Sequence, residues 1–192
     1  MKQALYQTEK TFEKIDFTQK TNEMGQYEDC VFINCNFLNT DLSDLSFTGC
    51  TFIGCDLSMA ALEKTELNDI VFKDCKMLGL RFENCNEFGL SLSFENCTLN
   101  YTSFYKTKLK KTIFRNSQLQ EVDFTAADLS GSVFDNCDLK RAVFDNTNLE
   151  KADFRGSVNY SLDPEKNRIK KARFSLSGVS GLLNKYDIDI QP

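Results

Sequence analysis

The fold of this chain is decided by residues 94–154, which read FENCTLNYTSFYKTKLKKTIFRNSQLQEVDFTAADLSGSVFDNCDLKRAVFDNTNLEKADF. Every fifth residue, from Phe94 to Phe154, is Phe or Leu in strict alternation. From Leu99 onward, the residue two places before each is smaller: Cys97, Thr102, Thr107, Thr112, Ser117, Val122, Ala127, Ser132, Cys137, Ala142, Thr147 and Ala152. Neither a helix nor a strand has this period, so the stretch is an internal repeat of five residues.

The repeat begins much earlier in the chain. The large apolar residue that recurs at every fifth position is called the central residue of its repeat. In the earlier part of the chain the central residues keep one phase, and they are Phe12, Phe17, Phe32, Phe37, Leu42, Phe47, Phe52, Leu57, Leu62, Leu67, Phe72, Met77 and Phe82. The phase then changes, because Phe94 follows Phe82 by twelve residues, two more than a pair of repeats. We predict that residues 83–93 bulge outward, with one repeat centred on Phe88. Two orientations stay open for this ring, one projecting from the surface and one turned back into the interior.

Bulk composition places the chain in a broad class. Its 192 residues, 41% hydrophobic with only 2 Pro and 9 Gly, predict one domain with a sizeable core. Residues 1–20 lack the apolar run of a signal peptide, and no stretch of 18 apolar residues is present. Eight cysteines without an export signal predict reduced thiols, and we expect a cytoplasmic protein that makes no membrane contact.

Three repeats carry a family resemblance. The segments ADLSG (127–131), CDLKR (137–141) and ADFRG (152–156) match the pattern A(D/N)LXX, in which the central residue is Leu or Phe, residue for residue or nearly so. Over residues 12–180 the chain therefore resembles the pentapeptide repeat proteins. The resemblance implies an all-β fold, a right-handed, four-sided parallel β-helix of about seven to eight coils. Residues 1–180 would form this β-helix, and residues 181–192 a short C-terminal cap that covers the open end of the last coil.

Catalytic and metal-binding motifs are missing from the sequence. Seven cysteines occupy the small inward position, namely Cys30, Cys35, Cys50, Cys55, Cys75, Cys97 and Cys137. Because there is neither a C-x-x-C pair nor any histidine, these thiols are predicted to pack in the core and to bind no metal. A tube filled by side chains offers no cleft for a substrate, so we expect neither an enzyme nor a cofactor.

Charge is distributed unevenly along the chain. Residues 1–100 carry 8 basic and 16 acidic side chains, net −8, whereas residues 101–192 carry 15 and 12, net +3. The repeat places one set of residues on two adjacent sides beside the bulge, and we predict that it binds a partner: Asp41, Asp44, Glu63, Glu66, Asp69, Glu83, Glu87 and Phe88.

Basic residues gather on one edge of the later coils, namely Lys106, Lys108, Lys110, Lys111, Lys166, Arg168, Lys170 and Lys171. This edge could contact nucleic acid or an acidic partner. The alternative is a solvated face, which the interspersed Asp128 and Glu150 favour, so no direct binding to nucleic acid is expected.

A second, shorter resemblance concerns function. The segment CDLSMA (55–60) and the pair Leu182-Leu183 are similar to segments of the Qnr-type quinolone-resistance proteins. This resemblance implies a non-enzymatic, DNA-mimicking protein that binds and protects DNA gyrase or topoisomerase IV. It also implies a homodimer through the C-terminal residues Leu182, Leu183, Tyr186, Ile188 and Ile190. The alternative is a structural or scaffolding β-helix with an unrelated protein partner.

Overall fold

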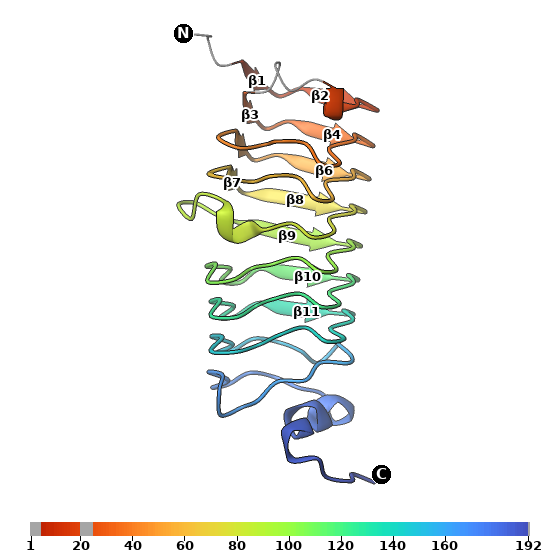
Figure 1. Cartoon of the computed structure of the whole chain (residues 1–192), viewed down its shortest axis with the longest axis vertical. Coiled ribbons are helices and arrows are strands. Elements are labelled where there is room, and N and C mark those ends of the chain that lie inside the picture. Colours follow the sequence, from red (N-terminus) through yellow and green to blue (C-terminus); the bar gives the residue numbers. More distant parts are fainter. Residues whose placement is uncertain (1–4, 20–24, 192) are drawn as a thin grey trace.

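The computed structural model describes residues 5–19 and 25–191, which wind into a tube of stacked coils (Figure 1). One side is a parallel sheet of β1 (Tyr6–Thr8), β3 (Gln26–Glu28), β5 (Ser46–Thr48) and β7 (Glu66–Asn68). A second side is a parallel sheet of β2 (Thr11–Glu13), β4 (Val31–Ile33), β6 (Thr51–Ile53), β8 (Ile70–Lys73), β9 (Leu92–Glu95), β10 (Ile113–Arg115) and β11 (Val133–Asp135).

The two remaining sides are held by single parallel bridges rather than by strands. One ladder of bridges joins Asp16, Asn36, Asp56, Lys76, Thr98, Gln118, Asp138 and Val158 in that order. Away from the bulge, partners in neighbouring coils are 20 residues apart, as Phe114 and Phe134 are. The predicted right-handed, four-sided parallel β-helix is therefore confirmed.

Nearly every corner of the tube has a left-handed backbone. The residue two places after the central one has positive φ, as in Asn34 (51°) and Lys111 (60°). The residue before the central one closes the same turn, because its side-chain oxygen accepts the amide two positions later. Leu38 N donates to Asn36 Oδ1 at 3.1 Å, and the same turn recurs at other corners, for example at Asp41, Asp56 and Asp128. These Asx turns explain why the repeat favours Asp or Asn at that place.

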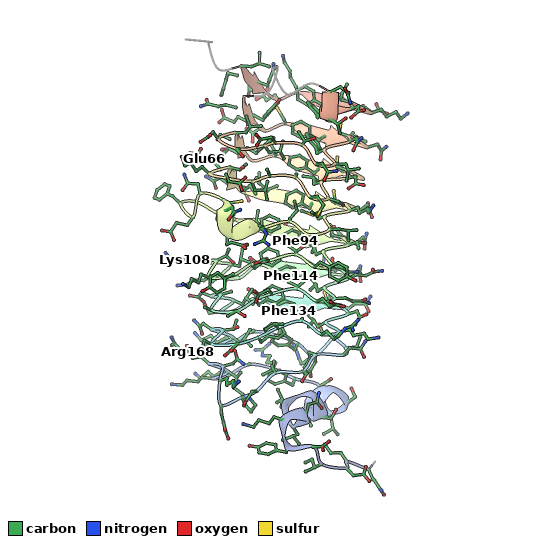
Figure 2. The ribbon with its side chains drawn as sticks, viewed as in Figure 1. Glu66, Phe94, Lys108, Phe114, Phe134 and Arg168 are labelled. Carbon is green, nitrogen blue, oxygen red and sulfur yellow. The ribbon has the colours of Figure 1, made fainter. Side chains whose placement is uncertain are left out.

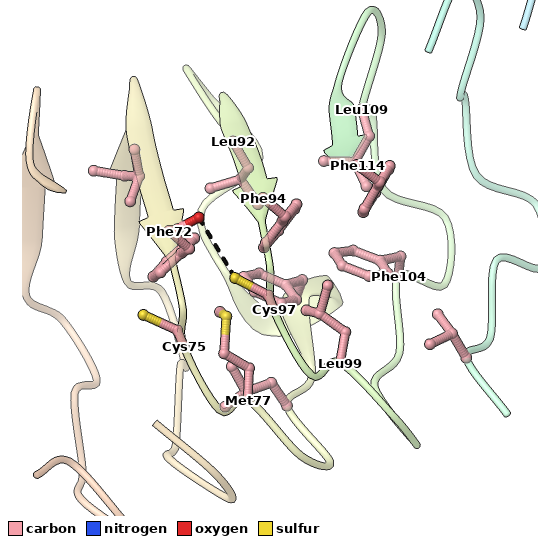
Figure 3. Packing of buried hydrophobic residues seen from close by; sticks show 14 of the residues in the cluster. Phe72, Cys75, Met77, Leu92, Phe94, Cys97, Leu99, Phe104, Leu109 and Phe114 are labelled. Carbon is pink, nitrogen blue, oxygen red and sulfur yellow. Dashed lines mark hydrogen bonds between the residues drawn. The ribbon is translucent and has the colours of Figure 1, made fainter. Parts of the chain in front are cut away.

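The interior is built from columns of like side chains. Phe94, Phe114 and Phe134 stack with ring centroids 5.1 and 4.9 Å apart, and Phe104 and Phe124 form a parallel column across the tube. Rings of the two columns meet edge to face at about 6 Å, the geometry favoured by aromatic pairs. Leucines fill the other two sides. Figure 3 shows this packing around β8 and β9.

All eight thiols are free and buried. The seven cysteines assigned to the small inward position lie there, and Cys85, which was not included among them, is buried as well. Cys97 Sγ donates to the Phe72 carbonyl of the preceding coil at 3.4 Å (Figure 3). Burial raises the pKa of Cys50 and of Cys137 to about 11, so these thiols stay protonated at neutral pH.

The insertion lies between Cys85 and Leu92, since Phe72 pairs with Phe94, 22 residues later. Leu90 turns back and packs against the core, whereas Phe88 is 88% exposed. A repeat centred on Phe88 is therefore wrong, and of the two orientations left open for its ring the outward one is observed. The bulge, defined from here on as residues 86–91, is narrower than predicted and projects from the tube in Figure 1. It follows the 3-10 turn η3 (Phe82–Asn84).

The far end is closed by two 3-10 helices, η4 (Leu176–Leu182) and η5 (Asn184–Tyr186), and a further 3-10 turn, η1 (Phe17–Gln19), lies in the first coil. Phe174 still stacks on Phe154 at 5.4 Å. Ser175 Oγ then accepts the Gly178 amide at 3.2 Å and begins η4. Val179 lies five residues after Phe174, the spacing of an inward residue, but it is instead exposed on η4. The cap thus begins at Leu176 rather than at residue 181.

Candidate protein-binding site

The acidic surface consists of seven carboxylates that the coils bring together on two adjacent sides: Asp41, Asp44, Glu63, Glu66, Asp69, Glu83 and Glu87. Six of these residues are exposed, and Glu83 is half-buried. They come from three successive coils, the last of which carries the bulge. Figure 2 places Glu66 on the edge of the tube from which the bulge projects.

Glu63 and Glu66 are held in place by uncharged donors. Glu63 accepts Ser43 Oγ at 3.2 Å and Asn84 Nδ2 at 3.0 Å, from the coils before and after it. Glu66 accepts Ser46 Oγ at 2.8 Å. Neither glutamate is paired with Lys or Arg among the described residues. Their negative charge is therefore fixed in position and not neutralised.

The three aspartates of the acidic surface lie at turns. Asp41 accepts the Ser43 amide at 3.0 Å, and hydrogen bonds from the Ser43 side chain and backbone lower the pKa of its carboxyl group. Asp44 and Asp69 are left-handed corner residues with φ of 59° and 55°. Their side chains point outward, because the inward positions of these repeats are taken by leucines.

The bulge presents one aromatic ring beside this charge. Phe88 N donates to Asn86 Oδ1 at 3.0 Å, and Gly89 follows with φ of 76°, a conformation that a residue with a side chain rarely adopts. Glu87 is paired with Lys108 at 3.1 Å, and both side chains are exposed. These features shape the backbone turn from which Phe88 projects outward.

Glu83 differs from the other carboxylates. Its side chain is 19% exposed, and its Oε2 has no hydrogen-bond partner among the described residues. Three exposed side chains that the sequence analysis did not single out lie near it, namely Met59, Tyr101 and Tyr105. The column of residues 59, 79 and 101 at the left-handed corner could have indicated Met59 and Tyr101, which are large side chains at corner positions, but it does not include Tyr105.

The same edge becomes basic in the later coils. Bridges align Lys108, Asp128, Asn148 and Arg168 in the column that contains Glu66 (Figure 2). Lys110 pairs with Asp128 at 3.4 Å, and Arg168 pairs with Glu150 at 2.8 Å. This alternation supports a solvated face there.

The C-terminal residues predicted to form a dimer do not share one surface. Leu182 packs against the core and Leu183 is half-buried, whereas Tyr186, Ile188 and Ile190 are exposed. Tyr186 Oη donates to Glu165 at 3.2 Å. Leu176 on η4 is 92% exposed and was not predicted, because the sequence analysis treated it as part of the last coil.

Within residues 5–19 and 25–191, no group of three or more His, Cys, Asp or Glu residues is arranged to hold a metal ion. No helix in the described part of the chain has the length and apolar character needed to cross a bilayer.

Comparison with known proteins identifies the repeat. The family pattern described as "Pentapeptide repeat region" matches residues 45–87 and 90–162. A trypsin-treated variant of QnrB1, a plasmid-mediated fluoroquinolone resistance protein, has a TM-score of 0.62 at 21% identity, with 98% of each chain covered. HetL, a pentapeptide repeat protein from the cyanobacterium Nostoc sp. strain PCC 7120 involved in regulating heterocyst differentiation, has a TM-score of 0.47 at 14% identity, covering 92% of this chain and 89% of its own. No curated protein matches the sequence.

Proposed function

Because this chain belongs to the pentapeptide repeat family, we propose that it is a non-enzymatic protein-binding module that contacts its partner through the acidic surface and the bulge. The observation that carries the proposal is Phe88, a residue that is 88% exposed beside the acidic surface. Exposing a large ring is unfavourable in water, and packing of the tube does not require it. An aromatic anchor within a ring of charge is typical of surfaces that bind proteins.

The partner that we propose is a type II topoisomerase, DNA gyrase or topoisomerase IV, with the acidic surface in place of DNA. The tube shares its fold with QnrB1, a fluoroquinolone resistance protein, and quinolones act on these enzymes. Carboxylates of the acidic surface would take the place of DNA phosphates. All of them lie within the first 100 residues, the half of the chain with net charge −8.

A charge estimate supports local rather than extended mimicry. The acidic surface spans three coils, roughly 14 Å at strand spacing, over which duplex DNA carries about eight charges. Its seven carboxylates minus the neighbouring Lys64, Arg81 and Lys108 leave a net charge of −4. This is about half the charge density of DNA, so Phe88 must add binding energy that charge alone does not provide.

Binding to purified gyrase tests the proposal. The full chain should bind at low ionic strength and lose affinity steeply as salt is added, because exposed charges are screened within about 8–10 Å. Phe88→Ala should weaken binding at least tenfold without changing the salt dependence, whereas Val158→Ala, an exposed aliphatic residue away from the bulge, should have no effect. Binding by Phe88→Ala equal to that of the wild type would contradict the role of the bulge.

A scaffolding β-helix with an unrelated protein partner is the second candidate. It is favoured by the mixed charge of the later coils, where ion pairs such as Lys110–Asp128 neutralise the edge. Absence of any gyrase or topoisomerase IV binding at low ionic strength would favour this candidate over the first.

We further propose that the chain forms a homodimer through its capped end. Tyr186, Ile188 and Ile190 are exposed there together with Leu176 and Val179 of η4. Covering these apolar side chains would also protect the last coil from pairing with other chains. Leu182, which packs against the core, would support the interface from beneath rather than contact the second copy.

A further inference from the structure

One hydrogen bond between coils is missing beside the bulge. Along this corner, the amide of each coil donates to a carbonyl of the next, as Lys106 N does to Thr125 O at 2.9 Å. The pattern predicts the same bond from Asn84 to Tyr105. Instead, Asn84 N donates to Arg81 O at 3.3 Å within η3, and no amide of the described residues donates to the Tyr105 carbonyl. The two coils are therefore not joined at this point.

Two cavities adjoin this break and share Glu83 and Tyr105. One, of about 380 Å³, lies on the side of the bulge, where Phe82 and Leu90 give it an apolar floor. The other, of about 490 Å³, extends toward Tyr101. These two cavities, both of which are lined by Glu83 and Tyr105, are together called the Glu83 groove below.

Glu83 is short of hydrogen-bond donors in this groove. Its Oε2 has no partner, and its Oε1 lies 3.8 Å from Arg81 Nη1, beyond hydrogen-bond distance. A buried carboxylate oxygen without a donor is unfavourable, so a donor supplied from outside would be stabilising. Rotation about the last torsion of a glutamate is soft, and either oxygen can thus turn toward the groove.

Tyr105 contributes two further features. Its carbonyl is an acceptor without a donor, as described above. Its ring already holds a cation, because Lys106 Nζ lies 4.8 Å from the ring centroid. The groove thus combines a carboxylate, a free carbonyl and an aromatic face above an apolar floor.

We propose that the Glu83 groove binds an arginine side chain of the protein partner. The guanidinium would donate to the Glu83 carboxylate and the Tyr105 carbonyl, and its aliphatic stem would lie against Phe82 and Leu90. A guanidinium has five donors in a planar fork and can satisfy two acceptors at once, whereas a phosphate or carboxylate would place acceptor against acceptor. The proposal rests on the proposed function, because the arginine belongs to the partner.

A titration without any partner tests this site. The probe is N-acetyl-L-arginine methylamide, added to the isotope-labelled full chain and followed by amide chemical shifts. We expect the amides of Glu83, Asn84 and Tyr105 to shift with half-saturation at about a millimolar, as for other small single-residue ligands. The citrulline analogue, which has nearly the same shape without the charge, should bind at least tenfold more weakly.

Two variants make the result specific. Glu83→Gln should weaken binding at least tenfold. Glu150→Gln is the matched control, because Glu150 is likewise half-buried, lies in a later coil outside the acidic surface and is already paired with Arg168, and it should change the affinity less than twofold. Should Glu83→Gln alter the fold, as seen in its spectrum, Tyr105→Leu provides a second variant at an exposed position. It keeps the backbone carbonyl but removes the aromatic face that lines the groove, and it should weaken binding at least threefold.

The proposal is overturned if Glu83→Gln binds arginine as the wild type does, or if citrulline binds equally well. Equal binding of the corresponding lysine derivative would overturn the assignment to a guanidinium. The two proposals can fail separately. If arginine does not bind in this titration, only the Glu83 groove is overturned, because no topoisomerase is present. If the chain does not bind gyrase, only the proposed partner is overturned, because arginine binding is measured without it.

Discussion

At the scale of single residues, the fold depends on a conformation that most amino acids avoid. The described chain has 24 residues other than glycine with positive φ, nearly all at corners of the tube. Left-handed backbone costs about 1–2 kcal/mol for a residue with a Cβ, and less for Asn and Asp. The recurrence of Asp and Asn at these corners follows from this difference, whereas Met59 and Tyr101 are unfavourable there.

Exchanging alanine and glycine at two corners should therefore have opposite effects. Gly131→Ala, at φ of 71°, should lower the free energy of unfolding by about 1 kcal/mol. Its new Cβ would meet Lys111 Cγ at 3.5 Å, an ordinary contact, so the loss reflects the backbone alone. Ala126→Gly, at φ of 57°, should raise stability by about 0.5–1 kcal/mol. Chemical denaturation measures both, and a stabilising Gly131→Ala would contradict this account.

The Asx turns also predict an acid-sensitive fold. Hydrogen bonds from Ser43 lower the pKa of Asp41 in the folded state. A lowered folded pKa gives stability that is present above the unfolded pKa, about 3.9, and is lost as pH falls through the folded value. Asp41→Asn keeps the turn oxygen but not the titration, so its stability should fall less between pH 5 and pH 3.

At the scale of structural elements, the ring columns dominate stability. Phe124 is fully buried between Phe104 and Phe144, at 5.3 and 5.1 Å. Replacing it by Ala should cost about 3–5 kcal/mol, as for other rings that leave a cavity. Phe88→Ala is the matched control and should cost less than about 0.5 kcal/mol, because its ring is exposed. Equal costs in denaturant would contradict the assigned orientations.

The element scale also separates what the sequence could predict from what it could not. The columns followed from the repeat alone, since one phase error would turn a Phe outward. The conformation of the coil that carries the bulge could not be predicted from the repeat, because two extra residues between Cys85 and Leu92 can be accommodated in several ways. The η3 turn, the half-buried Glu83 and the inward Leu90 all depend on that choice. Val179 was assigned to a coil for a related reason, since its spacing from Phe174 fits the repeat although Ser175 begins a helix there.

At the scale of the whole molecule, the two halves of the tube differ in net charge, −8 for residues 1–100 and +3 for residues 101–192, and the C-terminal end is capped. Replacing both Ile188 and Ile190 by Lys should abolish the proposed dimer, because two charges would be buried in an apolar contact. Light scattering should then give the mass of one chain, whereas Val158→Lys, on the side of the tube, should leave the mass unchanged. A wild-type protein that is monomeric at all concentrations would contradict the dimer.

Quinolone-inhibited DNA gyrase tests the central claim most directly. Supercoiling is measured while the inhibited enzyme is titrated with wild-type protein, with a triple reversal of Glu63, Glu66 and Asp69 to Lys, and with a control reversal of Glu13, Asp74 and Asp135. The control residues are also exposed, but they lie on or next to the seven-stranded sheet that runs from β2 to β11, away from the acidic surface. We predict that the wild type and the control restore supercoiling and that the first reversal does not. Equal restoration by all three proteins, or by none, would contradict a topoisomerase contact through the acidic surface.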